Sequence, residues 1–149
     1  MLRLKDIFIV HHSVFNDAFR NDYDTAFKDS SKNFFEMLLN HWIKNKQKIA
    51  FTSGEVYTKL YNTSVGKTKT FGIIHEYLCE IDFSTFNQTN PKISIEQSIF
   101  RLASKKCIEF SPFVVATNPK DKIKQDGTTF SVLTPKEAIE MYNDNGSRF

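Results

Sequence analysis

Polar side chains capable of chemistry gather at four places in this 149-residue sequence. Residues 11–13, His-His-Ser, follow one apolar segment, and residues 53–59 follow another. Glu96 begins an amphipathic stretch, and residues 117–119, Thr-Asn-Pro, end a third apolar segment. Histidines, carboxylates, hydroxyls and amides are the groups that proteins use to move protons, bind metal ions or contact phosphates. We expect a functional site where these four places meet.

The two adjacent histidines do not by themselves predict a metal site. Neighbouring side chains of an extended chain point to opposite sides, so His11 and His12 are expected to face apart. His11 directly follows an apolar run, and buried polar groups are usually hydrogen-bonded. We therefore interpret His11 as a hydrogen-bonded polar residue rather than as a metal ligand.

Short apolar segments alternate with amphipathic helices along the chain. Strands are predicted at residues 6–10, 48–52, 113–117 and 130–133, with an edge strand within 82–90. Helices are predicted at residues 14–19, 31–47, 54 onward, 68–80, 95–106 and 135 onward. This order indicates a three-layer α/β/α fold around a central, mainly parallel sheet of four or five strands. Ligands of such folds bind beyond the carboxyl ends of the strands, where the four polar places lie.

Three of these helices carry local start signals. Ser53 is a side-chain cap for the helix that follows it. Ser94 with Gln97, and Thr134 with Glu137, form capping boxes, the second with a proline at the first helical position.

Composition and charge are those of an ordinary globular domain. Lys and Arg number 20 and Asp and Glu 17, so the formal net charge is +3, and the basic residues are dispersed. Two cysteines, Cys79 and Cys107, exclude a disulfide scaffold, and no apolar run approaches the ~18 residues of a membrane span. We expect one domain over residues 1–149, in a cytoplasmic setting without a membrane partner. The 15 phenylalanines are expected to pack its core.

Four segments, taken in order, resemble one known family. Residues 7–14 read Ile-Phe-Ile-Val-His-His-Ser-Val, and residues 49–53 lead into a Ser-capped helix. Residues 117–119 read Thr-Asn-Pro, and residues 132–138 form a closing strand and capped helix. PIN domains, metal-dependent ribonucleases that include many bacterial toxins, have similar segments, with Asp-Thr-Asn or Asp-Thr-Ser after the first strand and Thr-Asn-Asp after the later one. The resemblance covers nearly the whole chain and implies a PIN-like fold.

The resemblance also implies where a metal site would lie. PIN domains hold one or two Mg²⁺ or Mn²⁺ ions with three or four acidic side chains, and the metal activates water. Carried over by position, the acid after the first strand falls on His11, and the acid of the Ser-capped helix falls on Lys59. The next acid falls on Glu96, and the acid of Thr-Asn-Asp falls on Pro119. Only Glu96 stays acidic, so the site is degenerate and no cofactor is expected.

Other acids provide an alternative site. Glu55 precedes Lys59 by one helical turn, and Asp121 follows Pro119 closely. Together with Glu96 they would make a rearranged Mg²⁺ or Mn²⁺ centre. The simpler interpretation is that Glu55 is a first-turn acid favoured by the helix dipole, and that Asp121 is an ordinary loop residue.

Three functions follow from these interpretations. The first is a catalytically degenerate PIN-like domain that binds RNA or a protein partner. Its RNA contacts would be Ser13, Ser53, Asn118, Lys120 and Lys122. The alternative is an active, toxin-like endoribonuclease of the toxin–antitoxin kind that uses Mg²⁺ or Mn²⁺. The third is a structural subunit that forms a homodimer through its apolar helix faces.

Lys59 carries the sharpest expectation. Its ammonium group is expected to point into the cleft near His11 and Glu96, filling the volume that a metal ion fills in an active relative. Removing it would leave a partly buried acid without a partner, so Lys59→Ala is expected to destabilise the fold by about 1–3 kcal/mol.

Overall fold

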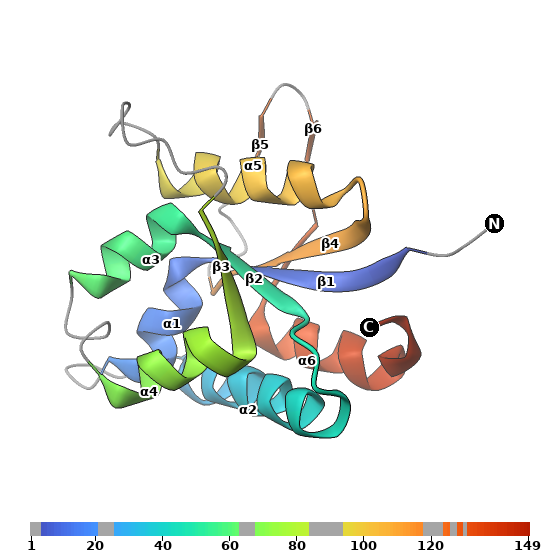
Figure 1. The fold of residues 1–149 in the computed structure, drawn as a ribbon, viewed down its shortest axis with the longest axis horizontal. Helices are drawn as coiled ribbons and strands as arrows, with labels where there is room; N and C mark the ends of the chain where they lie inside the picture. The colour runs from blue at the N-terminus through green and yellow to red at the C-terminus, as the bar shows by residue number, and fades with distance from the viewer. Residues whose placement is uncertain are drawn as a thin grey trace.

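The computed structural model describes residues 4–20, 26–62, 68–83, 94–117, 124–125, 128–129 and 131–149. Its strands are β1 (Lys5–Val10), β2 (Ala50–Ser53), β3 (Cys79–Asp82), β4 (Phe110–Val115), β5 (Lys124–Gln125), β6 (Thr128–Thr129) and β7 (Val132–Leu133). Five of them form an all-parallel sheet in the order β3-β2-β1-β4-β7 (Figure 1). β5 and β6 form a small antiparallel pair. The expected α/β class and parallel sheet are confirmed.

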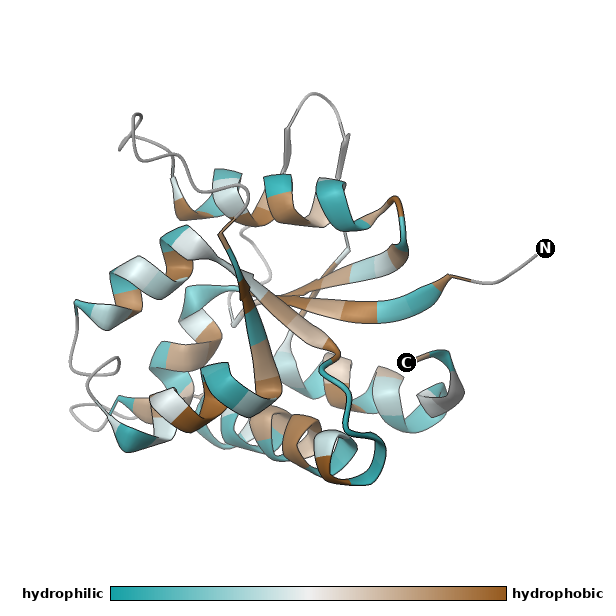
Figure 2. Ribbon diagram, viewed as in Figure 1, coloured by the Kyte–Doolittle hydropathy of each residue, from teal (hydrophilic) through white to brown (hydrophobic). Residues whose placement is uncertain are grey.

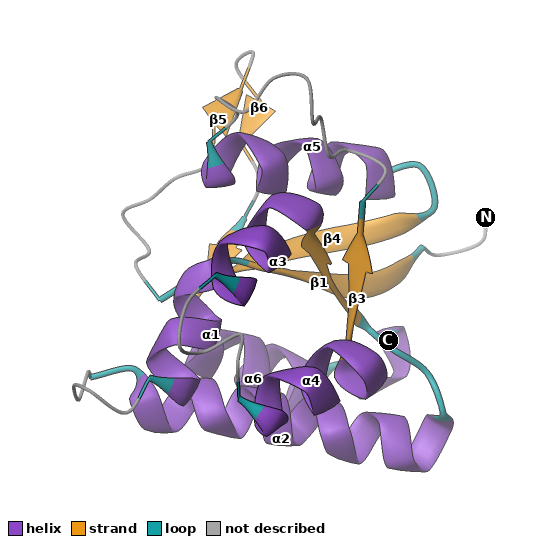
Figure 3. Ribbon diagram, turned by 60° about the vertical axis from the view of Figure 1, so that its left-hand side comes forward, coloured by secondary structure: helices purple, strands orange, loops and turns teal. Residues whose placement is uncertain are grey.

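Helices cover both faces of the main sheet. They are α1 (His12–Phe19), α2 (Lys28–Asn45), α3 (Gly54–Tyr61), α4 (Lys69–Ile73), α5 (Ile95–Lys106) and α6 (Pro135–Asp144). A π-helical turn, η1 (Ile74–Leu78), continues α4, and a 3-10 turn, η2 (Gly146–Arg148), follows α6. Figure 3 shows α5 on one face and α1, α2, α4 and α6 on the other. None of the helices in the described part of the chain is long and apolar enough to cross a membrane.

The central strand β1 is buried on both faces, as its unbroken apolar run predicts. Residues 7–10 are all at most 2% exposed, and Figure 2 shows apolar residues along most of this strand. The Phe8 ring packs edge-on against Phe34, with ring centroids 5.4 Å apart. Phe15 and Phe71 are also fully or almost fully buried, so phenylalanine is a main component of the core.

The three predicted helix starts are confirmed. Ser53 Oγ accepts the Val56 N–H at 3.1 Å. Both capping boxes form, at Ser94 before α5 and at Thr134 before α6. These starts depend on side chains only three residues away, which is why the sequence alone identifies them.

The chain departs from the prediction after α4. The helix expected to reach residue 80 ends in the π-helical turn, and Cys79–Asp82 form the edge strand β3 beside β2. Of the edge strand expected within 82–90, residue 82 is the last residue of β3, and residues 84–90 lie outside the described residues. Ile81 fits the helical spacing of the preceding apolar residues, whereas buried Cys79 beside exposed Glu80 fits a strand. The local pattern thus allowed both structures, and pairing with β2 decides between them.

The strand β4 begins at Phe110, before the predicted start at 113, although it contains Pro112. The Val114 N–H donates to the Ser131 carbonyl and the Ala116 N–H donates to the Leu133 carbonyl, so both N–H groups point toward β7. Pro112 points the same way but lies before the short pairing with β7 begins. Its missing N–H therefore leaves no carbonyl of the ladder without a donor.

A buried ion pair stabilises the amino end of β1. Asp6 is 0% exposed. Arg148 approaches it from η2, with Nε 2.9 Å from Oδ2 and Nη2 donating to Oδ1 at 3.2 Å. The buried carboxylate therefore depends on a cation that the sequence places far away, at the other end of the described chain.

Arg148→Met should lower the free energy of unfolding by about 2–4 kcal/mol, because it removes the guanidinium that contacts both oxygens of the buried Asp6 carboxylate. Urea denaturation measures this loss. Lys136→Met, at an exposed position of α6, is the matched control and should cost far less. The double variant Asp6→Leu with Arg148→Met should recover part of the loss, and equal losses in Arg148→Met and Lys136→Met would contradict this role.

Candidate functional site

The carboxyl ends of β1, β2 and β4 meet at one edge of the sheet, here called the carboxyl edge. The register pairs Val10 with Val115 across β1 and β4. Thr52 Oγ1 donates to the Val10 carbonyl at 2.7 Å, and the His11 N–H donates to the Val115 carbonyl at 2.9 Å. The segments that follow these strands are therefore held side by side.

His11 ends β1 and caps α1. Its Nδ1 accepts the Ser13 backbone N–H at 3.1 Å and lies 2.8 Å from Ser13 Oγ. A backbone N–H can only donate, so Nδ1 is the nitrogen without a hydrogen. The hydrogen of the neutral imidazole is then on Nε2. The helix cap thereby fixes the tautomer of His11.

Nε2 of His11 lies 3.2 Å from Oε1 of Glu96, the acid in the first turn of α5. The His11 side chain is 5% exposed and that of Glu96 49%, so the pair connects the buried carboxyl edge to solvent. Burial acts to raise the pKa of the Glu96 carboxyl. Hydrogen bonds from its own backbone N–H and from His11 outweigh burial, so this pKa lies below its ordinary value.

Ser13 connects the histidine to the end of β4. Its Oγ accepts the Thr117 N–H at 3.2 Å. Its hydroxyl thus joins α1 to the segment after β4 and supports the His11 ring at the same time. His11, Ser13, Glu96 and Thr117, from three of the four places expected to meet, are thus brought together in one hydrogen-bonded group.

The expectation that the two histidines face apart is wrong. Their ring centroids lie 4.4 Å apart. His11 has an extended backbone, but His12 is the first residue of α1, so the two do not lie in one continuous strand and the period of two does not apply. Burial lowers the pKa of His12 to about 4, with His11 and Lys59 acting in the same direction and Glu96 opposing. Its buried Nδ1 has no hydrogen-bond partner.

The expected pairing of Lys59 with Glu96 within the cleft is also wrong. Its side chain is exposed, and the ion-pair partner of Glu96 is His11. Lys59 lies near enough to His12 to lower the pKa of that histidine. An exposed ammonium group gains little from a charge pair, so the large destabilisation expected for Lys59→Ala does not follow.

Ser53, expected to contact RNA, is 0% exposed. Its Oγ caps α3 and lies 2.8 Å from Oγ of Ser98, which is equally buried. A fully buried side chain does not contact a ligand directly, so this prediction is corrected. Ser53 instead holds the start of α3 against α5. Sequence reasoning missed Ser98, although its spacing from Ile95 and Leu102 places it on the buried face of α5.

The alternative acidic site is only partly within the described residues. Both carboxylate oxygens of Glu55 are buried and without a hydrogen-bond partner. In the described ranges, no three His, Cys, Asp or Glu residues are grouped so that they could hold a metal ion. The remaining predicted site residues lie outside the described residues: Asn118, Pro119, Lys120, Asp121 and Lys122.

No protein-family model matches the chain, and no curated protein sequence matches it.

The low pKa of His12 predicts acid sensitivity. Unfolded histidine takes up a proton near pH 6.5, whereas folded His12 does so near pH 4. Between these values the unfolded state binds more protons, so the free energy of unfolding falls as the pH is lowered. We expect a loss of roughly 1–2 kcal/mol across this window, reduced from the full shift because the ring is partly exposed.

Urea denaturation of the unchanged protein and of His12→Asn at several pH values between 7 and 4 tests this. The substitution should flatten the dependence in that window. Glu96 should also lower the free energy of unfolding as the pH falls, but at lower pH. Its pKa is lowered in the folded state, so the stability that its carboxylate contributes is lost as that carboxylate is protonated. Parallel curves for the two proteins would contradict the assignment to His12.

Proposed function

We propose that this chain is a PIN-like domain that binds RNA at its carboxyl edge and does not cut it by metal chemistry. The observation that carries the proposal is the hydrogen bond from His11 Nε2 to Glu96 Oε1, at 3.2 Å. This pair lies beyond the end of the central strand, where the resemblance would put the first and third acids of a metal centre. The order of strands and capped helices supports the family resemblance.

The hydrogen bonds of His11 leave it no free lone pair for a metal. Nδ1 is used to cap α1, and Nε2 carries the hydrogen that Glu96 accepts. Coordination through Nε2 would require that hydrogen to leave and Glu96 to give up its bond. The pair is therefore suited to holding the carboxyl edge in place and poorly suited to ligating an ion.

Phosphate is a better ligand for this edge than a divalent cation. Lys59 is exposed on α3 beside the histidines, and the chain carries a net charge of +3. Lys120 and Lys122, the other lysines expected to contact RNA, follow β4 in the sequence and lie outside the described residues. Contacts of this kind position an RNA backbone without reading its sequence.

One observation favours the alternative of a metal-dependent ribonuclease. The Glu55 carboxylate is buried with neither oxygen hydrogen-bonded, and such a group is usually paired or metal-bound. An ion between Glu55, Glu96 and Asp121 would satisfy it. A second candidate function is therefore Mg²⁺- or Mn²⁺-dependent RNA cleavage.

RNA binding should depend on salt and on Lys59. Fluorescence anisotropy with a labelled single-stranded RNA should give an affinity that falls as salt rises from about 50 to about 200 mM. Lys59→Glu should weaken binding about fivefold at the lower salt and reduce the logarithmic salt slope by about 0.7. Lys136→Glu, an exposed change on α6, is the matched control and should have little effect. Equal effects of the two variants would contradict a contact at Lys59.

Calorimetric titration with Mg²⁺ and Mn²⁺ separates the two functions. The binding proposal predicts no tight ion site, because His11 and Glu96 are bonded to each other. It also predicts that labelled RNA stays intact with either ion. Tight binding that Glu96→Ala abolishes, together with cleavage lost in Glu96→Gln, would establish the ribonuclease instead.

A further inference from the structure

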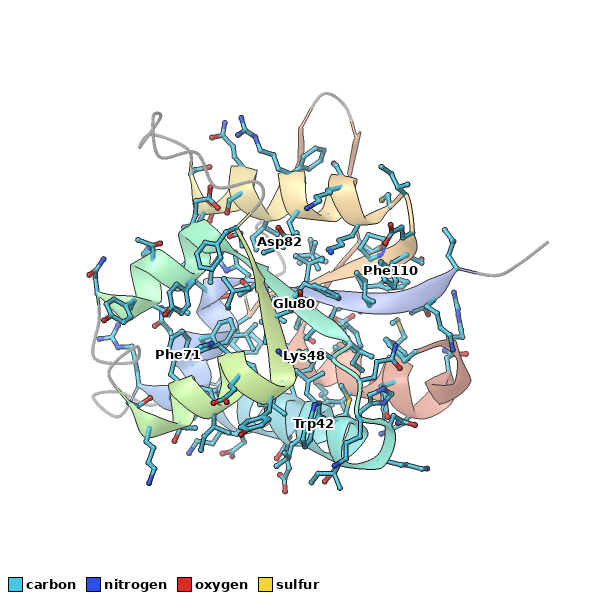
Figure 4. The ribbon with its side chains drawn as sticks, in the orientation of Figure 1. Trp42, Lys48, Phe71, Glu80, Asp82 and Phe110 are labelled. Carbon is cyan, nitrogen blue, oxygen red and sulfur yellow. The ribbon has the colours of Figure 1, made fainter. Side chains whose placement is uncertain are left out.

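Three aromatic rings form a column from the core to the surface across α4 and α3. Phe71 is 2% exposed, and Figure 4 labels it between these two helices. The Tyr57 ring lies against it with centroids 5.9 Å apart and planes at 25°. Tyr61 continues the column, 5.9 Å from Tyr57 at 29°, and is 59% exposed. The outermost ring thus presents a flat face to solvent.

A fourth ring stands beside this column. Phe83, directly after β3, meets Tyr57 edge-on at 5.6 Å and is 51% exposed. His75 meets Tyr57 from another direction, at 5.5 Å. Tyr57 is therefore fixed by neighbours on several sides and supports Tyr61 and Phe83. We call these three residues, Tyr57, Tyr61 and Phe83, the aromatic platform.

The platform adjoins the carboxyl edge. α3 starts directly at the end of β2, and Ser53 is paired in register with Asp82, the residue before Phe83. Figure 4 labels Asp82 at the end of β3 next to α5, whose Lys105 approaches it to 3.2 Å. Phe83 thus lies at the end of β3, next to the end of β2, and Tyr61 lies at the far end of α3, the helix that follows β2.

The position of Lys59 connects the platform to the histidines. Residues 57 and 61 share one side of α3, because they are one helical turn apart. Lys59 is two residues from each of them and therefore lies on the other side of α3, near enough to His12 to lower the pKa of that histidine. A chain crossing α3 would meet exposed aromatic faces on one side and an exposed positive charge on the other.

We propose that Tyr61 and Phe83 stack unpaired bases of a single-stranded RNA whose phosphates pass near Lys59. The inference rests on the proposed RNA-binding function and names its ligand class. Bases have flat π faces that stack on exposed aromatic rings, and this stacking tolerates any sequence. In duplex RNA the bases are already stacked and paired, so their faces are not available to the platform.

Fluorescence anisotropy with three labelled probes tests the proposal. The probes are oligo(U) and oligo(A) of about 12 nucleotides and a duplex RNA of the same length. The unchanged protein should bind both single strands more tightly than the duplex. Tyr61→Ala and Phe83→Ala should each weaken single-strand binding about tenfold, whereas Tyr61→Phe, which keeps the ring, should stay within about twofold.

Tyr77→Ala is the matched control. Tyr77 is also an exposed tyrosine, 39% exposed, but it packs edge-on against Trp42, away from the platform. Its replacement should leave RNA affinity unchanged. Thermal unfolding of all variants should show that each remains folded at the assay temperature, which is expected because the replaced rings are largely exposed.

The outcomes separate the two levels of the proposal. If the unchanged protein binds single strands and neither Tyr61→Ala nor Phe83→Ala weakens binding, the platform is wrong and RNA binding stands. Duplex binding as tight as single-strand binding, or an equal loss in Tyr77→Ala, would also overturn the platform. If no RNA probe binds at low salt, the platform and the proposed function both fail.

Discussion

The hydrogen bonds on both sides of the carboxyl end of β1 determine where the candidate site lies. Thr52 donates to the Val10 carbonyl from β2, and the His11 N–H donates to Val115 of β4. These bonds fix the last residues of the central strand from two directions before α1 begins. The backbone of His11 is therefore fixed by the sheet. Glu96, at the start of α5, accepts a hydrogen bond from the His11 ring but does not determine where the ring lies.

One side chain serves two purposes here. The Nδ1 of His11 caps α1 by accepting a hydrogen bond from the Ser13 N–H. The ring hydrogen is therefore on Nε2, which donates to Glu96. A helix cap and a polar contact across the carboxyl edge are thereby coupled through one imidazole ring. The ring of His11 thus links the start of α1 to the start of α5 across this edge of the sheet.

Local patterns predicted much of the fold and less of the site. The strand β1 and the capping boxes depend on residues close in sequence, so they were predicted correctly. The proximity of His11 and His12 depends on the exact residue at which α1 starts. Hydrophobic periodicity does not locate a helix start to within one residue. Lys59 has a long, flexible side chain whose direction is set by solvent rather than by pattern. The aromatic platform combines α3 with the end of β3, and β3 itself was assigned to a helix, so no local signal joined those rings.

The ion pair between Asp6 and Arg148 has a consequence for the order in which the molecule is completed. The two residues are 142 positions apart, and chains are synthesised from the amino end. The central strand is thus synthesised well before the guanidinium that pairs with its buried carboxylate. Until Arg148 has been synthesised, the buried Asp6 carboxylate cannot form this ion pair. The amino end of β1 can therefore acquire this ion pair only after the whole stretch from Asp6 to Arg148 has been synthesised.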